Sequence, residues 1–275
     1  MAGTLYLVGT PIGNLGDFSA RGIETLKAVD FIAAEDTRVT LKLLNRFEIK
    51  KPLISYHEHN KADMGERIIS RLLSGESAAL VSDAGMPAIS DPGEVLVRQC
   101  AAEGIAVCPI PGACAAVSAL AVSGLQTGRF TFEGFISTAK KSRTEHLEGL
   151  KREARTMIIY EAPHKLCRTL ADLLAALGDR EISICREMTK IHEEILRTTL
   201  SGAIAHFEKT APRGEFVLVV RGAPEKSEES ATPEQAMELV DFYRAEGKSL
   251  KQACRLASAD TGLGVNELYA RATKG

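Results

Sequence analysis

Alternating strand and helix patterns in the first part of the chain restrict its fold more than any other feature. Short apolar runs predict strands at residues 4–8, 31–34, 78–81 and 105–110. Between these runs, capping residues and apolar residues at helical spacing predict helices at residues 20–28, 37–47, 62–73 and 93–102. Because parallel strands are joined by helical crossovers, this alternation predicts a parallel sheet with helices packed on both faces.

Strand patterns follow one another more closely in the second part of the chain, where helices at residues 113–125 and 163–177 are also predicted. The expected strands are residues 130–135, 157–160, 182–186, 194–199 and 216–220. Their close succession favours a mixed sheet over a purely parallel one. A polar stretch then leads to three short predicted helices, at residues 233–245, 250–259 and 265–272, which together have the size of a helix-turn-helix unit.

These patterns divide the chain into an N-terminal α/β domain at residues 1–116, a second α/β domain at 117–223, a linker at 224–232 and a small helical domain at 233–275. A hydrophobic fraction of 45% is enough for a real core. The net charge of −2 argues against a protein that coats nucleic acid through bulk electrostatics, although it allows a localised basic patch.

Metal binding and membrane insertion are not expected. No Cys-x-x-Cys pair occurs among the six cysteines, and His57 and His59 share one face of an extended segment without a third ligand nearby, so we predict no metal. Thiols in apolar runs indicate a reducing compartment. No apolar run reaches the roughly 18 to 20 residues of a membrane helix, and no signal peptide is evident. We therefore expect a cytoplasmic protein without membrane contact.

Four loops at predicted strand ends carry the residues that suggest chemistry. They are the glycine-rich residues 8–17, residues 81–93 with two carboxylates and two prolines, residues 109–116, and residues 160–165 beside a charged strand end at 186–190. Loops at the carboxyl ends of parallel strands are where α/β proteins bind ligands, and glycine lets backbone amides approach a ligand closely. Each loop by itself also fits a structural role, such as a tight turn, a helix cap at Asp91, close helix packing or a solvated surface.

As a set, the loop sequences resemble one family. The matching segments are LVGTPIGNL at residues 7–15, AEDTR at 34–38, SYHEHN at 55–60, SDAGMP at 82–87 with SDPG at 90–93, YEAPH at 160–164 and RGEF at 213–216. They resemble the ribosomal RNA small subunit methyltransferase I family, which is the rRNA branch of the tetrapyrrole methylase superfamily. The resemblance covers residues 5–221, and the terminal helices look like the small C-terminal domain of that family.

This resemblance implies two α/β domains of tetrapyrrole-methylase type, a class III methyltransferase, with a small C-terminal helical domain. It further implies a homodimer that acts on the small ribosomal subunit and uses S-adenosylmethionine to methylate the 2′-oxygen of a cytidine ribose, at position 1402 of 16S rRNA. Carried over by position, the residues expected to bind S-adenosylmethionine between the two domains are Thr10, Pro11, Gly13, Asn14, Asp83, Gly85, Met86, Ala88, Ile89, Cys114, Ala115, Tyr160, Glu161 and Ala162.

Two differences from the tetrapyrrole enzymes of that superfamily bear on the substrate. Many of those enzymes have Gly-Asp-Pro where this chain has Gly85-Met86-Pro87, and they tend to have Thr-Ser where it has Cys114-Ala115. We therefore expect donor contacts through the backbone and disfavour a porphyrin or corrin substrate. The alternatives that stay open are a tetrapyrrole (precorrin or uroporphyrinogen) methyltransferase and a non-catalytic ribosome-binding factor with the same fold.

The implied reaction needs a group that takes the proton of the 2′-hydroxyl or orients it, because a neutral hydroxyl is a poor nucleophile. The candidates are Asp36, Glu161 and Lys190, and the sequence does not choose among them. RNA binding needs positive charge that reaches phosphate. The expected contacts are Arg38, Lys140, Lys141 and Arg143, and the alternative for the last three is an ordinary solvated helix.

Overall fold

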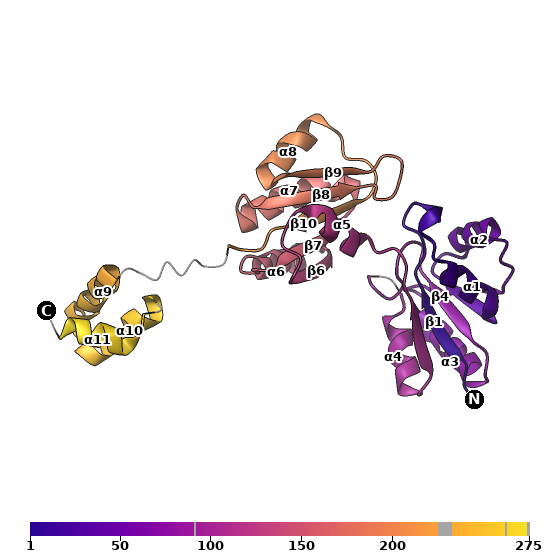
Figure 1. The fold of residues 1–275 in the computed structure, drawn as a ribbon, viewed down its shortest axis with the longest axis horizontal. Helices are drawn as coiled ribbons and strands as arrows, with labels where there is room; N and C mark the ends of the chain where they lie inside the picture. The colour runs from indigo at the N-terminus through magenta and orange to yellow at the C-terminus, as the bar shows by residue number, and fades with distance from the viewer. Residues whose placement is uncertain (91, 225–232, 262, 274–275) are drawn as a thin grey trace. The chain divides into compact units, whose positions relative to one another are not determined.

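The computed structural model describes residues 1–90, 92–224, 233–261 and 263–273 (Figure 1). The chain forms two compact units, Met1–Gly222 and Ala223–Gly275. The first unit contains two lobes, each built on a five-stranded sheet, and the second unit is helical. Apart from Pro224, the predicted linker at residues 224–232 lies outside the described residues, as does the predicted cap Asp91. No helix within the described ranges is long and apolar enough to cross a membrane.

The first lobe confirms the predicted parallel sheet. Its strands are β1 (Thr4–Val8), β2 (Phe31–Ala34), β3 (Leu53–Ser55), β4 (Ala78–Val81) and β5 (Ala106–Ile110), in the spatial order β3-β2-β4-β1-β5. Every pairing is parallel, so the carboxyl ends of all five strands lie along one edge. The prediction lacks β3, because this edge strand has only three residues and none of them is fully buried.

Helices cover both faces of this sheet, as the alternation predicts. They are α1 (Ala20–Ala28), α2 (Thr37–Arg46), α3 (Lys61–Leu73) and α4 (Glu94–Ala102). Neighbouring residues of β2 point to opposite faces. Phe31 belongs to a buried cluster with Ile68 of α3, whereas Ile32 belongs to a second cluster with Leu44 of α2.

The second lobe has the mixed sheet that the sequence predicts. Its strands are β6 (Phe130–Phe135), β7 (Thr156–Glu161), β8 (Glu181–Arg186), β9 (Glu194–Thr199) and β10 (Phe216–Val220), in the order β6-β7-β10-β8-β9. Only β6 and β7 pair in parallel, and the other three pairings are antiparallel.

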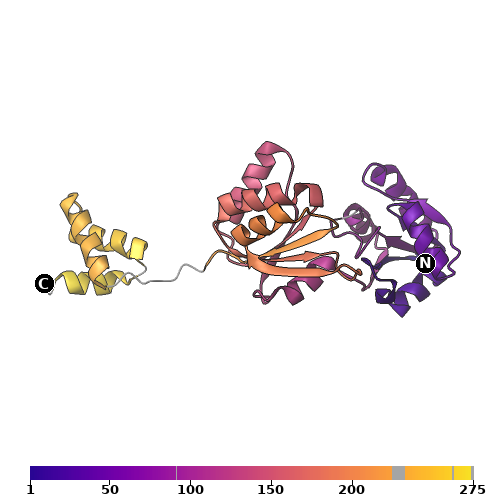
Figure 2. The same cartoon turned by 90° about the horizontal axis from the view of Figure 1, so that it is seen from above.

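Four helices pack on the second sheet: α5 (Ala115–Ser123), α6 (Lys140–Leu150), α7 (Pro163–Leu177) and α8 (Leu200–Lys209). Helices α6, α7 and α8 share one face, and α5 lies on the other (Figure 2). Because Ala119 and Leu120 of α5 share a buried cluster with Val217 and Val219 of β10, α5 belongs to the second lobe. The predicted boundary at residue 116 falls inside this helix, and the packing moves it to residues 111–114, between β5 and α5.

The second unit contains the three predicted helices, α9 (Pro233–Ala245), α10 (Leu250–Thr261) and α11 (Val265–Ala272). Val240, Cys254 and Leu268, one from each helix, are fully buried in a common cluster. This small core, formed without residues from the first unit, explains why the unit is compact by itself.

Candidate functional site

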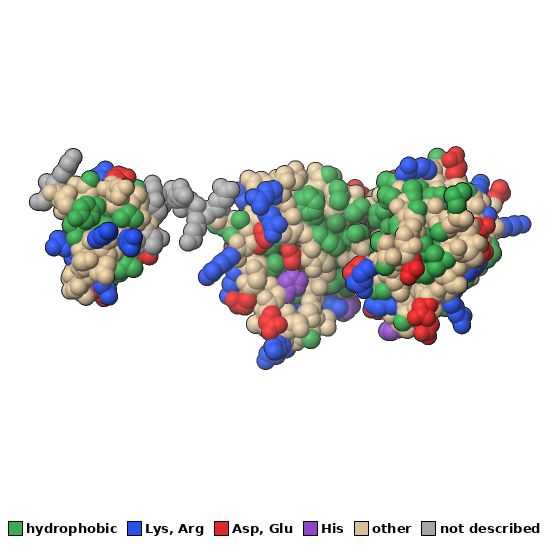
Figure 3. Space-filling model, turned by 90° about the horizontal axis from the view of Figure 1, so that it is seen from below, with side chains coloured by type: hydrophobic (Ala, Val, Ile, Leu, Met, Phe, Trp, Pro, Cys, Tyr) green, Lys and Arg blue, Asp and Glu red, His purple; other side chains and the backbone are tan. Residues whose placement is uncertain are grey.

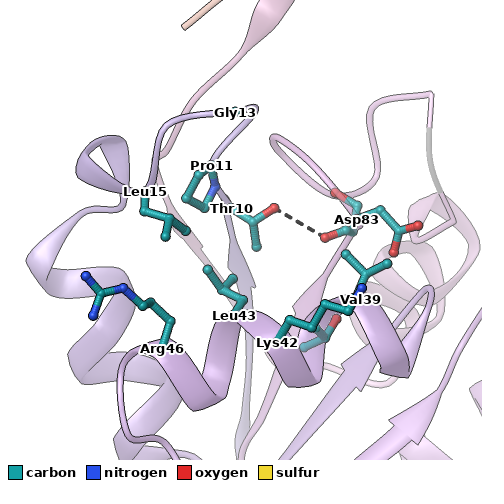
Figure 4. Close-up of a pocket in the computed structure, with 11 residues that line it drawn as sticks. Thr10, Pro11, Gly13, Leu15, Val39, Lys42, Leu43, Arg46 and Asp83 are labelled. Carbon is teal, nitrogen blue, oxygen red and sulfur yellow. Dashed lines mark hydrogen bonds between the residues drawn. The ribbon is translucent and has the colours of Figure 1, made fainter. Parts of the chain in front are cut away.

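The loops after β1, β4 and β5 meet at the carboxyl edge of the first sheet, because those three strands are parallel neighbours. A pair of backbone hydrogen bonds joins the first two loops: the Thr10 N–H donates to the Gly85 carbonyl (2.9 Å), and the Gly85 N–H donates to the Thr10 carbonyl (3.1 Å). The buried Thr10 hydroxyl donates to the Ser82 carbonyl (3.2 Å; Figure 4). Residues 9–14, here named the β1 loop, are thereby fixed against the loop after β4.

Two glycines, Gly9 and Gly112, also bring the β1 loop into close contact with the loop after β5. A Cβ atom on Gly9 would lie 2.8 Å from Gly112 Cα, and a Cβ atom on Gly112 would lie 2.7 Å from the Gly9 carbonyl oxygen. Cβ atoms do not tolerate such short distances to backbone, so both positions require glycine. Three loops that are far apart in the sequence therefore form one connected edge.

A cavity of about 460 Å³ lies beside this edge, lined by loops of the first lobe and strand ends of the second. Nine of the fourteen residues predicted to bind the donor line it: Asp83, Gly85, Met86, Ile89, Cys114, Ala115, Tyr160, Glu161 and Ala162. The prediction lacks nine further lining residues: Ile12, Glu35, Ala84, Ser90, Phe135, Pro163, Glu215, Phe216 and Val217. We name it the carboxylate cavity, because its lining contains four Asp or Glu residues and no Lys, Arg or His.

Glu161, at the end of β7, is 3% exposed and held from two sides. The Thr169 hydroxyl donates to its Oε2 (2.6 Å), and the Ala162 N–H donates to its Oε1 (2.8 Å). Behind Thr169, the Arg143 Nη2 donates to the threonine hydroxyl (3.0 Å). Buried charges are tolerated when they are hydrogen-bonded in this way, and the carboxylate is consequently fixed in one orientation.

Glu35 and Asp83 follow the neighbouring strands β2 and β4, and their loops interlock. The Asp83 N–H donates to Glu35 Oε2 (3.4 Å), and the Asp36 N–H donates to Asp83 Oδ1 (3.0 Å). Desolvation raises the pKa of Glu35 above its usual 4.5, and the negative charges of Asp83 and Asp36 raise it further, while the hydrogen bond from Asp83 opposes the shift. Glu35 therefore has an increased proton affinity.

A second pocket, of about 400 Å³, also borders the β1 loop (Figure 4). It is lined by Thr10, Pro11 and Gly13, three more of the residues predicted to bind the donor, and by Lys42 and Arg46 of α2. We name it the basic pocket. Asp83 lines both the basic pocket and the carboxylate cavity.

The remaining two predicted donor residues, Asn14 and Ala88, line neither space. The Asn14 side chain accepts a hydrogen bond from the Gly16 N–H (2.9 Å) and caps a 3₁₀ helix at Leu15–Asp17. Ala88 has φ of +67° and Ser90 has φ of +63°, a region that non-glycine residues rarely adopt. Strain of this kind is common where a loop is shaped for binding.

The three candidate catalytic residues differ in their surroundings. Only Glu161 lines the carboxylate cavity. Hydrogen bonding to the Arg38 guanidinium (2.6 Å) lowers the pKa of Asp36 to about 2, which makes it a weak base. Desolvation lowers the pKa of Lys190, but hydrogen bonds to Glu187 (2.9 Å) and Glu215 (3.0 Å) outweigh it and the pKa is raised. Lys190 is therefore protonated at neutral pH and poorly suited to accept a proton.

The residues predicted to contact RNA differ in their exposure to solvent. The side chains of Arg38 and Lys141 are 87% and 89% exposed, and Lys140 is exposed as well. Arg143 is 5% exposed, because it points into the lobe and donates to Asp172 (2.7 Å) and Thr169. This corrects the prediction for Arg143, whose guanidinium is not presented to a phosphate. On the face drawn in Figure 3, Lys and Arg are scattered among Asp and Glu and, among the described residues, form no continuous basic surface.

Known proteins resemble both the sequence and the fold. Residues 4–204 match the profile of the Tetrapyrrole (Corrin/Porphyrin) Methylases. The chain is 52% identical over 273 residues to the "Ribosomal RNA small subunit methyltransferase I" of Halalkalibacterium halodurans, covering 97% of this chain and 93% of that protein. It is 50% identical over 220 residues to the protein of the same name from Thermotoga maritima, covering 80% and 99%, respectively. The crystal structure of diphthine synthase, 15% identical, matches with a TM-score of 0.60 over 79% of this chain and 90% of that one.

These similarities agree with the architecture. The profile match spans both lobes, and the structural match shows that their fold is that of a class III methyltransferase, followed here by C-terminal helices. The Thermotoga relative leaves about a fifth of this chain unmatched, which is the size of the helical unit. The chain belongs to the ribosomal RNA small subunit methyltransferase I family of the tetrapyrrole methylases.

Proposed function

We propose that this chain transfers a methyl group from S-adenosylmethionine to the ribose 2′-hydroxyl of a cytidine in 16S rRNA, at position 1402. The observation that carries the proposal is the carboxylate cavity and the basic pocket, which both border the β1 loop. A cationic donor suits the first and an anionic RNA strand suits the second. The relatives' name, which refers to the small-subunit rRNA, supports the same assignment.

The carboxylate cavity fits the chemistry of S-adenosylmethionine. Its volume lies in the range of small-molecule sites, and its carboxylates would favour the sulfonium and ammonium charges of the donor. Ala84, Gly85 and Ala115 have small side chains or none, so a ligand can approach the backbone closely where they line the cavity. Ile89, which is 53% exposed, and Phe135, which is 57% exposed, offer apolar surface to a flat base.

S-adenosylmethionine supplies an electrophilic methyl group, and the protein aligns the hydroxyl with it. As the oxygen–carbon bond forms and the carbon–sulfur bond breaks, the hydroxyl proton must leave. We assign that proton to the Glu35 carboxylate, which lines the cavity and has a raised pKa. Glu161 serves as an orienting group, because the hydrogen bonds from the Thr169 hydroxyl and the Ala162 N–H hold its carboxylate in one orientation at the cavity wall.

The other parts of the proposal concern assembly and RNA. Arg38, Lys140 and Lys141 are exposed and give outlying contacts to the rRNA of the small subunit. We also propose a homodimer, with the exposed apolar side chains of Val117 and Ile191 as candidate contacts. We place the activity in the cytoplasm, where small subunits are assembled.

A methyl-transfer assay with labelled donor tests the function. The full chain is incubated with unmodified small subunits, naked 16S rRNA or a porphyrinogen, and the RNA is digested to nucleosides. The proposal predicts label in 2′-O-methylcytidine from one or both RNA substrates. Label in the porphyrinogen would instead identify a tetrapyrrole methyltransferase. Binding to the subunit without transfer would identify a non-catalytic ribosome-binding factor.

A further inference from the structure

Lys42 and Arg46 lie one helical turn apart on α2 and both line the basic pocket (Figure 4). Both side chains are exposed, and neither forms an ion pair or hydrogen bond with another described residue. By contrast Arg38, one turn earlier on the same helix, is paired with Asp36 (2.6 Å). The two cations of the pocket therefore keep their charge available for a ligand.

The rest of the basic pocket limits what that ligand can be. Leu15 is 45% exposed and Val39 is 39% exposed, and both line the pocket beside the two cations. Thr10 and Thr40, each 3% exposed, also line it. A site with two cations, one carboxylate at Asp83 and an apolar rim keeps a positive balance of charge, and it suits a ligand that joins an anionic group to a flat, weakly polar group, as a nucleotide does.

The position of the pocket points to a particular nucleotide. Ile12 of the β1 loop lines the carboxylate cavity, whereas Pro11 and Gly13 on either side of it line the basic pocket. Asp83 is common to both spaces. A strand whose reacting sugar reaches the carboxylate cavity would thus bring a flanking nucleotide to the basic pocket.

We propose that the basic pocket binds a phosphodiester, with its attached nucleoside, adjacent to the methylated nucleotide of the RNA strand. This inference rests on the proposed function. Lys42 and Arg46 contact the phosphate oxygens, and Leu15 and Val39 contact the sugar or base. The pocket is a recognition site for RNA and takes no part in bond making.

The test removes both charges in the full chain with Lys42→Ala/Arg46→Ala. A matched control, Lys27→Ala/Arg67→Ala, removes one lysine and one arginine that are exposed on the same lobe but line neither space. Binding to unmodified small subunits or 16S rRNA is measured from about 50 to 200 mM salt, together with KM and kcat for the RNA. Binding of S-adenosylmethionine alone is measured by calorimetry.

For the Lys42→Ala/Arg46→Ala variant we expect RNA affinity about tenfold weaker and KM about tenfold higher, with kcat within about twofold of wild type. The slope of log affinity against log salt should fall by about 1.5, since two phosphate contacts are lost. Donor affinity should not change. A variant that behaves like the control in RNA affinity and salt slope overturns the inference.

The binding measurements keep this inference separate from the proposed function. If wild type binds RNA but transfers no methyl group, the proposed function fails while the slopes still judge the pocket. If wild type methylates RNA and the two double variants have equal RNA affinity and slope, the function stands and the inference fails. If wild type binds neither small subunits nor rRNA, the inference fails as well.

Discussion

The carboxylate cavity and the basic pocket share Asp83 and the β1 loop, yet they hold their charges in opposite ways. In the carboxylate cavity, Glu161 is buried and bonded to Thr169, and Glu215 is paired with Lys190. In the basic pocket, Lys42 and Arg46 are exposed and without an ion pair among the described residues. The carboxylates of the first space are thus held by hydrogen bonds or ion pairs, whereas the two cations of the second have no such partner among the described residues.

This difference matches the ligands that we propose. A small donor must be placed so that its methyl group aligns with the attacking oxygen, and preorganised groups achieve this at least entropic cost. An RNA strand is held through phosphates that carry no sequence information, for which long and mobile cationic side chains are adequate. The sign of a charged side chain therefore indicates the charge of the ligand. Whether hydrogen bonds hold that side chain in place indicates how accurately the ligand must be positioned.

The largest effect expected is from Glu35→Gln, which keeps the shape of the side chain but removes its ability to accept a proton. We expect kcat to fall at least about a hundredfold, with little change in donor affinity. In wild type, kcat should decrease as pH falls through the raised pKa of Glu35, because the protonated form cannot act as a base. Single-turnover methylation between about pH 4 and 9 measures the loss in the variant and the pH dependence of wild type. The control is Glu24→Gln, which changes an exposed carboxylate on α1. Unchanged kcat in Glu35→Gln would remove Glu35 from the mechanism.

The fixed charges of the carboxylate cavity are tested by Thr169→Val. This change leaves an acceptor on Glu161 and a donor on Arg143 without their partner, while the side-chain volume stays the same. We expect the free energy of unfolding to fall by about 2 kcal/mol. Urea denaturation measures this, and Thr169→Ser, which keeps the hydroxyl, should lose less. Equal losses for the two variants would mean that the hydrogen bonds to Glu161 and Arg143 contribute little.

The shared residue gives the most direct test of the comparison itself. Asp83→Asn removes a negative charge from both spaces, so it should weaken the cationic donor and favour the anionic RNA. We expect donor affinity to fall about tenfold and RNA affinity to rise about twofold. Calorimetry with the donor and filter binding with 16S rRNA measure the two changes. A shift of both affinities in the same direction would contradict the assignment of one ligand to each space.

The smallest effect expected is from Arg38→Ala, which releases the Asp36 carboxylate. The pKa of Asp36 should rise from about 2 toward its usual value of 3.8. Since the folded-state pKa is lowered, Asp36 contributes stability above about pH 4 that is lost as pH falls through about 2. The variant should lack most of this pH dependence. Carboxyl titration followed by NMR, with acid unfolding in parallel, measures both; an unshifted Asp36 in the variant would show that Arg38 does not set its pKa.

Much of the fold could be predicted because strand and helix periodicities differ clearly in this sequence. The strands and helices that the prediction lacks have physical reasons: β3 has three residues at a sheet edge, and α8 is a short helix that follows β9 without a loop. In α6, Arg143, Leu147 and Leu150 recur at helical spacing and are all buried. That spacing is the signal that could have placed Arg143 in the interior.

The site was predictable where loops carry glycine, proline and carboxylates at strand ends, and less so elsewhere. Phe135 and Val217 reach the carboxylate cavity from strands of the second lobe. The sequence of a strand does not show whether its side chains line a ligand-binding cavity. Glu35 adjoins the predicted Asp36, but burial raises the pKa of Glu35 whereas hydrogen bonds to Arg38 lower the pKa of Asp36, and the sequence shows neither environment. The division of the β1 loop residues between two spaces depends on tertiary contacts with α2.

The bridge between Thr10 and Gly85 has a consequence for the order of events during turnover. It ties the β1 loop to the loop after β4, so any ligand that tightens one loop also restricts the other. If the proposed donor and RNA both tighten these loops, their binding is coupled, and thermodynamic reciprocity requires that the factor by which bound donor changes the RNA affinity equals the factor by which bound RNA changes the donor affinity. If bound RNA increases the donor affinity, a protein molecule that has bound RNA retains its methyl donor. The demethylated product of the donor then leaves more easily once the modified RNA has dissociated.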